Sequence, residues 1–196
     1  MVTEFYEGGD LQKYMGKRNY EALDEDVVRR FALKLAKGIS YLHERNIVHR
    51  DIKPENILLD GGKNMVESPV LADFEYAKLL RDKGTCSRIC GTKGYMAPEI
   101  LTEKPYSLPV DIWSFGTLIY ALVSSQLPFP VPDQKLQKDN IELNATLILH
   151  TKLTFKGKPW TKVSDDLKDL LTRMLKKNPS KRLTIEQVLD HPWFQE

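Results

Sequence analysis

The chain has 196 residues, 41% of them hydrophobic and 29% charged, which is the composition of an ordinary globular domain able to build one core. Its 29 lysine and arginine residues against 27 acidic ones give a formal charge of +2, too balanced to indicate a nucleic-acid or membrane partner. The longest apolar run, 112–123, is too short to span a bilayer and the first residues lack a secretory signal, so we expect a cytoplasmic or nuclear protein.

The first predicted elements are a strand end and two helices. Residues 1–6 lean apolar, a glycine pair at 8–9 interrupts them, and a helix is expected to start at Leu11. Segment 24–45 carries apolar residues at the spacing of one helical face, acids in its first turn and Asn46 just past its end. This pattern predicts a long helix that packs in the core.

Short apolar runs at 47–48 and 57–59 read as strands, and the sequence HRDIKPEN between them reads as a tight loop. In that loop Asp51 comes two residues before Lys53 and five before Asn56. Asp51 can accept a proton from an attacking hydroxyl, and Lys53 can neutralise charge on a transferred phosphoryl group. The carboxamide of Asn56 can offer an oxygen to a divalent cation, so the loop predicts phosphate chemistry.

A second metal ligand is expected at Asp73. After a turn at 60–62, the apolar run 70–72 returns as a strand that ends at this carboxylate, which can chelate the Mg²⁺ that bridges nucleotide phosphates. An aspartate in such a place is more often a simple turn residue. The spacing from Asn56 favours the metal-ligand interpretation.

Segment 76–95 is polar and basic with few apolar residues, which predicts a mobile surface loop. It contains both cysteines of the chain, Cys86 and Cys90, too few for a disulfide framework or, without neighbouring histidines, for a zinc site. We interpret them as two reduced thiols. A redox switch between them is the less favoured alternative, because cytosolic disulfides are rare.

The rest of the chain predicts helices. Pro98–Glu99 opens a short one, and Ser107 with Pro109 starts another that is apolar on nearly all sides from 112 to 123 and must therefore run through the core. The prolines within 127–132 end that helix.

Past these prolines, the polar segment 133–144 stays unassigned. Further on, Ser164 caps a helix that ends before Asn178–Pro179. Thr184 and Gln187 form a capping box for the last helix.

The HRD triplet at 49–51, followed after four residues by Asn56, resembles the catalytic loop of eukaryotic protein kinases. The resemblance is specific because further motifs follow in the family's order and spacing. These are DF at 73–74, APE at 97–99, DIWSFG at 111–116 and the lone Arg182. Lys53–Pro54 and Thr92 are similar to the serine/threonine branch of that family.

The resemblance implies a mainly α fold, with a hinge at 1–10 and a large C-terminal lobe at 11–196, a helical bundle whose short β-hairpins carry the catalytic loop. The tail, with KPW at 158–160 and HPWF at 191–194, resembles the calcium/calmodulin-dependent kinase group. The chain has no counterpart of the glycine-rich loop, strand lysine and helix glutamate that kinases place before the hinge. We therefore expect a partial kinase domain without its small β lobe.

By this resemblance Asp51 is the base toward a serine or threonine hydroxyl of a protein substrate, Lys53 stabilises the transferred phosphate, and Asn56 and Asp73 hold the Mg²⁺ of ATP. Further nucleotide contacts are implied at the backbones of Glu4 and Tyr6 and at Asp10, Glu55 and Leu58, with Thr3 as gatekeeper. Asp10 and Glu55 would also favour basic substrates, although Ala121 stands where some basophilic kinases carry an acid. The sequence does not indicate an oligomeric state.

The activation segment of the family corresponds to residues 76–95, and phosphorylation there orders the loop by pairing with the arginine of the catalytic loop, here Arg50. The position most often phosphorylated is held by Arg88, with Thr85 and Ser87 as neighbouring candidates. We hypothesise a segment that is either constitutively ordered or switched through one of these two. Thr92 is implied to bond the catalytic aspartate and lysine.

Three residues have implied structural roles. Glu99 pairs with Arg182 in a buried, bidentate contact, and Asp111 anchors the backbone of the catalytic loop. Glu75 departs from the family, which expects glycine there, and a left-handed backbone at this glutamate would cost about 1–2 kcal/mol. The leading interpretation is a serine/threonine protein kinase, and the alternative is a catalytically impaired, kinase-like scaffold or regulatory binding module.

Overall fold

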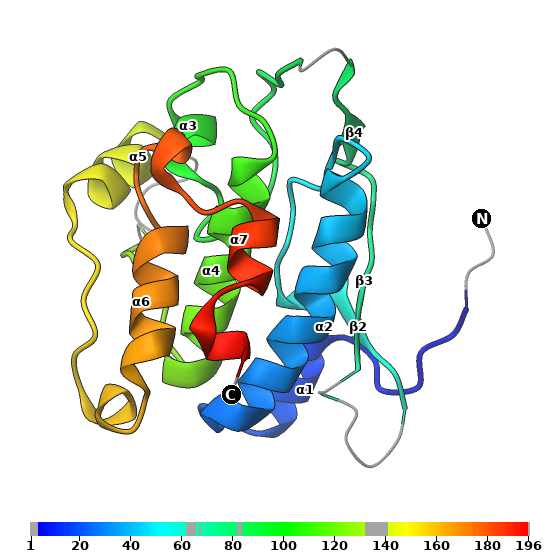
Figure 1. Ribbon diagram of the computed structural model, residues 1–196, viewed down its shortest axis with the longest axis vertical. Helices are drawn as coiled ribbons and strands as arrows, with labels where there is room; N and C mark the ends of the chain where they lie inside the picture. The colour runs from blue at the N-terminus through cyan, green and yellow to red at the C-terminus, as the bar shows by residue number, and fades with distance from the viewer. Residues whose placement is uncertain (1–3, 62–65, 67, 82–83, 132–140, 196) are drawn as a thin grey trace.

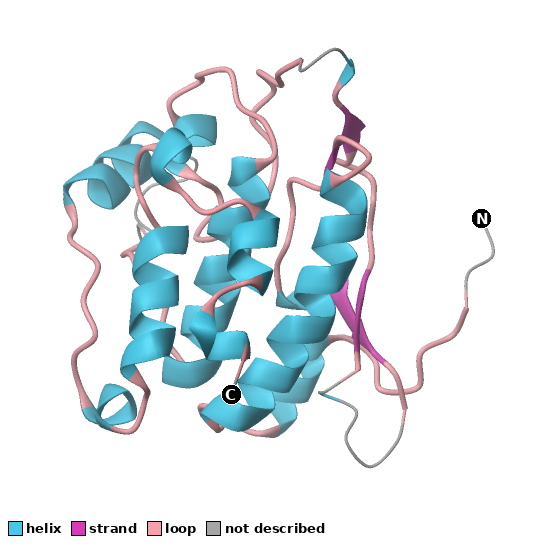
Figure 2. Cartoon of the chain, in the orientation of Figure 1, coloured by secondary structure: helices cyan, strands magenta, loops and turns pink. Residues whose placement is uncertain are grey.

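The protein is described here by a computed structural model that covers residues 4–61, 66, 68–81, 84–131 and 141–195. Helices dominate this part of the chain, as expected, and the strands are short (Figures 1 and 2). The α-helices are α1 (Leu11–Lys17), α2 (Glu25–His43), α3 (Pro98–Leu101), α4 (Pro109–Ser124), α5 (Ile141–His150), α6 (Asp165–Met174) and α7 (Ile185–Leu189). Short 3-10 helices occur at Pro54–Asn56 (η1), Lys158–Thr161 (η4), Pro179–Lys181 (η5) and Pro192–Phe194 (η6).

The core is built around α4, as its apolar sequence predicts. Figure 1 shows α4 behind α7, with α2 on one side and α6 on the other. Trp113 and Phe115 of α4 are fully buried, and so are Phe31 and Leu35 on the inner face of α2. Because each flanking helix offers an apolar face to α4, burial holds the bundle together. No helix in the described ranges has the length and apolarity needed to cross a bilayer.

The helix caps agree with their sequence signals in most places. The hydroxyl of Ser164 accepts a hydrogen bond from the backbone of Leu167, and Thr184 and Gln187 form both bonds of a capping box. The prediction for α4 was wrong in one detail, because its N-cap is Leu108 without a side-chain bond, rather than Ser107.

The strands form two separate antiparallel pairs. Strand β2 (Ile57–Leu59) pairs with β3 (Pro69–Leu71) as a hairpin, with Leu58 opposite Val70. Strand β1 (Ile47–Val48) pairs with the more distant β4 (Lys78–Leu79), so this second pair is not the hairpin that the sequence suggested. The loop at 49–56 therefore connects two different sheets, and each of its ends is fixed by a different partner strand.

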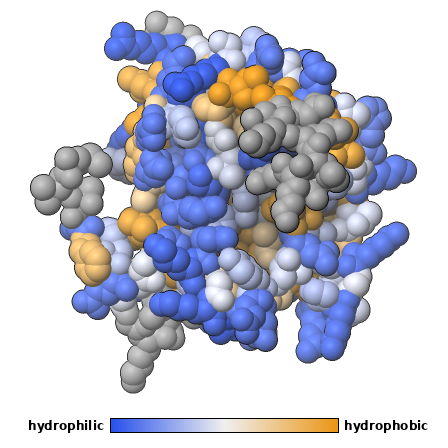
Figure 3. All heavy atoms as spheres, turned by 180° about the vertical axis from the view of Figure 1, so that it is seen from behind, coloured by the Kyte–Doolittle hydropathy of each residue, from blue (hydrophilic) through white to orange (hydrophobic). Residues whose placement is uncertain are grey.

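Three further expectations differ from the structure. Residues 4–6 are not in a strand, because no described strand pairs with them. Segment 76–95 is more than a surface loop: it contains β4, and Leu80, Cys86 and Cys90 are buried. Helix α5 begins inside the segment left unassigned, although its buried positions 145 and 148 have helical spacing. Seen from the back of the view in Figure 1, the surface is largely hydrophilic with smaller hydrophobic patches (Figure 3).

Candidate active site

The carboxylate of Asp51 lies at the centre of a compact hydrogen-bond network. Thr92 Oγ1 donates to Asp51 Oδ1 at 2.8 Å, and Lys53 Nζ lies 2.9 Å from Asp51 Oδ2. Lys53 Nζ also donates to Thr92 Oγ1 at 2.7 Å, and Asn56 Nδ2 donates to Asp51 Oδ2 at 2.9 Å. Asp51 is buried, so these hydrogen bonds hold its carboxylate in one fixed orientation.

The two expected cation ligands lie at the ends of two paired strands, since Asn56 directly precedes β2 and Asp73 follows β3 by two residues. The N–H of Ala72 donates a hydrogen bond to the backbone oxygen of Asn56 at 2.9 Å. Asp73 is the next residue after Ala72, so the pairing of β2 with β3 brings the backbone of Asp73 close to Asn56. Both side-chain hydrogen bonds of Asn56 leave from Nδ2, which keeps its Oδ1 available, and Asp73 is exposed.

These donors fit Mg²⁺ in kind, because that ion prefers oxygen ligands and takes one or two from protein with the rest from phosphates and water. The described residues contain no group of three or more His, Cys, Asp or Glu that could hold a metal unaided. The donor set therefore suits a cation that arrives with a phosphorylated ligand.

The prediction of a left-handed, strained backbone at Glu75 was wrong. The left-handed conformation belongs to Asp73, with φ 60°, and Glu75 is absent from the described residues with positive φ. Aspartate tolerates this conformation better than most residues because its short polar side chain bonds locally. Here Asp73 Oδ1 accepts a hydrogen bond from the N–H of Glu75 at 3.2 Å, so residue 75 helps to support the turn.

The N-terminal segment lies along the edge of β2. The N–H of Gly8 donates to the carbonyl of Leu59 at 3.1 Å, and Asp10 forms a β-bridge with Leu58. A Cβ at Gly8 would lie 2.6 Å from the Leu59 carbonyl oxygen, which explains the glycine. Asp10 caps α1 through the N–H of Lys13 at 2.8 Å and pairs with its ammonium at 2.8 Å.

The other residues predicted to contact the nucleotide do not form one network like that around Asp51. Glu4 is exposed, and its carboxylate accepts a hydrogen bond from the hydroxyl of Tyr6 at 3.0 Å. Glu55 is exposed and Leu58 is half-buried. Thr3 lies outside the described residues. The structure thus brings Asp51, Lys53, Asn56 and Thr92 into direct contact, while Glu4 and Tyr6 contact each other.

Asp111, the buried acid at the start of α4, holds the backbone of the catalytic loop. Its two carboxylate oxygens accept hydrogen bonds from the N–H groups of His49 and Arg50, each at 2.8 Å, and His43 Nε2 lies 3.0 Å away. Burial alone would raise the pKa of Asp111, but the hydrogen bond and charge of His43, together with His49, hold this pKa below its ordinary value.

This depressed pKa predicts a specific loss of stability in acid. A carboxyl group whose pKa is lower when folded contributes stability above its unfolded pKa, about 3.9, and that contribution is lost as the pH falls through the folded pKa. We expect the free energy of unfolding to fall below about pH 4, and Asp111→Asn to make its pH dependence shallower there, as measured by urea unfolding across pH.

Asp169 supplies a matched control, because His191 Nε2 also lies 3.0 Å from its carboxylate, but the side chain of Asp169 is 46% exposed. Asp169→Asn should change the acid dependence much less than Asp111→Asn. If Asp111→Asn does not fold, His43→Gln, which removes the imidazole that lies 3.0 Å from this carboxylate, should move the acid transition to higher pH. An acid transition unaffected by both Asp111→Asn and His43→Gln would contradict this assignment.

Tyr106 was missed by sequence reasoning, yet it joins the catalytic loop to segment 76–95. Its hydroxyl donates to the carbonyl of Arg88 at 2.5 Å and accepts from Arg50 Nη1 at 3.3 Å, and its backbone forms a β-bridge with Cys86. Arg50 Nε donates to the carbonyl of Tyr76 at 2.5 Å. The guanidinium that was expected to pair with a phosphate is therefore already engaged by this segment.

The candidate phosphorylation sites are not part of this contact. Thr85 and Ser87 are exposed, and within the described residues no hydrogen bond joins either of them to Arg50. The thiols of Cys86 and Cys90 are free and buried, and Cys90 Sγ lies 3.5 Å from the Tyr106 hydroxyl. Within the described residues, Tyr106 thus contacts both Arg50 of the catalytic loop and Arg88 of segment 76–95, and no local sequence signal singles it out.

We expect Tyr106→Phe to loosen segment 76–95. The change leaves the carbonyl of Arg88 without this donor and removes one partner of Arg50, at a cost of about 1–3 kcal/mol of stability. The buried thiol of Cys90 should then react faster with a thiol reagent under native conditions. Tyr41→Phe, at a tyrosine that is 57% exposed, is the control. Equal labelling rates in the two variants would show that the hydroxyl does not hold the segment.

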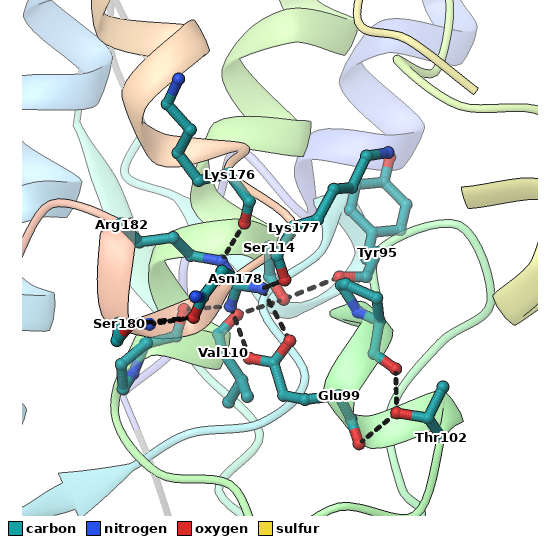
Figure 4. Close-up of polar contacts among 12 residues, drawn as sticks. Tyr95, Glu99, Thr102, Val110, Ser114, Lys176, Lys177, Asn178, Ser180 and Arg182 are labelled. Carbon is teal, nitrogen blue, oxygen red and sulfur yellow. Dashed lines mark hydrogen bonds and ion pairs between the residues drawn. The ribbon is translucent and has the colours of Figure 1, made fainter. Parts of the chain in front are cut away.

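The expected partners Glu99 and Arg182 meet in a buried, bidentate ion pair (Figure 4). Arg182 Nη1 and Nη2 donate to the two carboxylate oxygens of Glu99 at 2.5 and 2.6 Å. The same guanidinium donates to the carbonyls of Pro109 at 3.1 Å, Lys176 at 2.8 Å and Lys177 at 3.3 Å. One arginine therefore fixes α3, the start of α4 and the turn after α6.

Comparison with known proteins agrees with the resemblance to protein kinases that the motifs indicate. The family model described as "Protein kinase domain" matches residues 1–194. Over its whole length the chain is 36% identical to serine/threonine-protein kinase ATG1b of Arabidopsis thaliana and 35% identical to the SNF-related serine/threonine-protein kinase of Homo sapiens. It is 37% identical to serine/threonine-protein kinase DCLK3 of Mus musculus. The chain spans 26%, 24% and 24% of the lengths of these relatives, respectively.

Proposed function

The chain belongs to the protein kinase family, and its relatives are serine/threonine-protein kinases. From this membership we propose that it forms the catalytic-loop half of an enzyme that transfers the γ-phosphate of ATP to serine or threonine hydroxyls of proteins. Residues 1–10 are proposed as the hinge and 11–196 as the large lobe. The observation that carries the proposal is the contact network of Asp51 with Lys53, Thr92 and Asn56.

Each residue of this network has a proposed task. Asp51 accepts the proton of the substrate hydroxyl, and its fixed orientation favours that transfer. Lys53, 2.9 Å from Asp51, is positioned to neutralise charge on the phosphoryl group as it moves. Thr92 bridges the two and thereby ties the loop after β4 to the catalytic loop.

Asn56 Oδ1 and the carboxylate of Asp73 are the proposed ligands of Mg²⁺. A bound ion would bridge phosphate oxygens of ATP and offset their charge. The nucleotide is proposed to lie against the segment at 4–10, next to β2, with Glu4, Tyr6, Asp10, Glu55 and Leu58 as candidate contacts. Asp10 is already paired with Lys13, so we assign it a smaller part in this contact.

Regulation and subgroup are also proposals. Arg50 donates hydrogen bonds to the hydroxyl of Tyr106 and to the carbonyl of Tyr76, so it already has partners without a phosphate. These contacts support a segment 76–95 that is ordered without phosphorylation, in preference to a segment that is switched at Thr85 or Ser87. The motifs KPW at 158–160 and HPWF at 191–194 support a position near the calcium/calmodulin-dependent kinases.

The test is transfer of labelled γ-phosphate from Mg·ATP to serine-containing peptides by the protein that contains this chain. Transfer that requires Mg²⁺ supports the proposal. Mg·ATP binding measured by calorimetry, together with no transfer to any peptide, would support the alternative of a kinase-like binding module. Absence of both binding and transfer would overturn the proposed nucleotide chemistry.

A further inference from the structure

A cavity with a volume of about 430 Å³ lies beside His43, where the end of α2, the start of α4 and the first residues of α7 meet. This volume is in the range of pockets that bind small organic molecules. Among the described residues of its wall, none belongs to the network around Asp51 or to the proposed Mg²⁺ ligands. Much of the wall is aliphatic, from Leu80, Leu108, Ile112, Leu183 and Ile185.

His43 offers this cavity a polar atom that has no partner in the described part of the chain. The side chain of His43 is only 4% exposed, and its Nε2 lies 3.0 Å from the carboxylate of Asp111. No hydrogen bond within the described residues reaches the other ring nitrogen, Nδ1. Nδ1 is also absent from the fully enclosed polar atoms that lack a partner, so it is open to the cavity that His43 lines.

Asp111 determines which nitrogen of His43 carries a proton. The carboxylate of Asp111 accepts hydrogen bonds from the N–H groups of His49 and Arg50, and because its pKa is held below the ordinary value it has no proton to donate. The contact with His43 therefore requires a proton on Nε2. In the neutral imidazole Nδ1 is then a hydrogen-bond acceptor, so the partner that it lacks is a donor.

The charge on the cavity wall favours a cation. Glu186 lines the cavity, and its pKa is lowered, chiefly by a hydrogen bond from the side chain of Thr184, so its carboxylate is ionised. No ion pair joins Glu186 to another residue in the described ranges. The guanidinium of Arg182 also lines the cavity, but Glu99 already matches its charge.

Other classes of small molecule suit these groups less well. A carboxylate or a phosphate would face the negative charge of Glu186, with Asp111 behind His43. A purely apolar molecule would cover His43 Nδ1 without supplying a donor. An ammonium group supplies N–H donors and a positive charge, and an apolar body attached to it gains from contact with the aliphatic wall.

We propose that this cavity binds a small organic amine, whose ammonium group donates to His43 Nδ1 and lies near Glu186 while its apolar body packs against the aliphatic wall. Such an occupant is connected to the catalytic loop, because His43 contacts Asp111 and Asp111 holds the backbone of Arg50. The inference goes beyond the proposed kinase function and does not depend on phosphate transfer.

The test compares probes that share a phenylethyl body and differ in the end group, namely phenethylamine, 2-phenylethanol and 3-phenylpropionate. Their dissociation constants are measured by saturation-transfer NMR at neutral pH with the protein that contains this chain. Phenethylamine should bind about tenfold more tightly than 3-phenylpropionate, with 2-phenylethanol between them, because the wall repels an anion. An alcohol or a carboxylate that binds as tightly as the amine would overturn the inference.

Variants of the wall locate the binding. Glu186→Gln should weaken phenethylamine binding about threefold or more and leave 2-phenylethanol unchanged, because only the charge is removed. Glu142→Gln, the same change at an exposed glutamate of α5 outside the cavity, is the matched control and should alter neither.

Ser107→Leu supplies a second, steric test, because Ser107 is a half-buried residue of the cavity wall. The larger side chain occupies part of the cavity and should weaken both phenethylamine and 2-phenylethanol about tenfold or more. Phenethylamine binding that is unchanged in Glu186→Gln and in Ser107→Leu would place the amine elsewhere and overturn the assignment.

The connection to the catalytic loop has its own measurement. Saturating phenethylamine should slow hydrogen exchange at the N–H groups of His49 and Arg50, which donate to Asp111, because the amine holds His43 in place against that carboxylate. The N–H of Leu167, which donates to Ser164 Oγ outside the cavity, is the control and should slow by a smaller factor. Equal slowing at Leu167 and at the catalytic loop would overturn this connection.

Discussion

Replacement of Asp51 by asparagine is expected to lower phosphate transfer by a factor of about 10²–10⁴ in the protein that contains this chain. The amide cannot accept the proton of the substrate hydroxyl. It also brings an N–H₂ group toward Lys53 and Asn56, which both donate to Asp51 Oδ2 in the wild type. The main effect should be on kcat, with a smaller change in KM for ATP, because the proposed nucleotide contacts are at other residues.

The measurement is steady-state transfer to a serine peptide, with circular dichroism as a check on folding. Glu21→Gln is the matched control, since it is the same carboxylate-to-amide change at an exposed residue. A folded Asp51→Asn variant that keeps more than about a tenth of wild-type activity would contradict the role of Asp51 as base.

The second large effect is expected on stability. Arg182→Met should lower the free energy of unfolding by about 3–5 kcal/mol, because Glu99 is left buried and charged without its partner. Arg182 is also the donor to the carbonyls of Pro109, Lys176 and Lys177, which methionine cannot replace. For a chain of this size the loss corresponds to a fall in Tm of roughly 6–20 °C.

Two further variants make this prediction specific. The double variant Glu99→Gln/Arg182→Met removes the unpaired charge, so it should be more stable than Arg182→Met alone even though it has one more substitution. Breaking the exposed pair of Lys168 with Asp165, through Asp165→Asn, should leave Tm unchanged. If Arg182→Met and Asp165→Asn lower Tm equally, the buried pair of Glu99 and Arg182 does not make the proposed contribution to stability.

Much of the local structure follows from local patterns. The apolar spacing in α2, the capping signals at Ser164 and Thr184, and the continuous apolar run of α4 each predict their helix. Helix α5 was missed because its first residues follow a polar segment and it buries few side chains. Its positions at 141, 145 and 148 have the helical spacing that could have revealed it.

The site was predicted in part. The residue types of the HRDIKPEN loop indicated phosphate chemistry, and the family resemblance supplied the pairing of Glu99 with Arg182, which no local pattern contains. The strain assigned to Glu75 was wrong because sequence position alone does not tell which residue of a turn takes the left-handed conformation. In the structure Asp73 takes it, since its carboxylate can bond the N–H of Glu75.

The sequence by itself determined most of the helices, α5 excepted, and indicated the kind of chemistry, because both depend on residues close together along the chain. Only the tertiary structure decided that Tyr106 engages Arg50, and that Met15, Tyr95 and Ala121 line one pocket. The physical reason is that such contacts form between elements far apart in sequence, and the packing of the whole core, rather than any local propensity, selects which side chains meet.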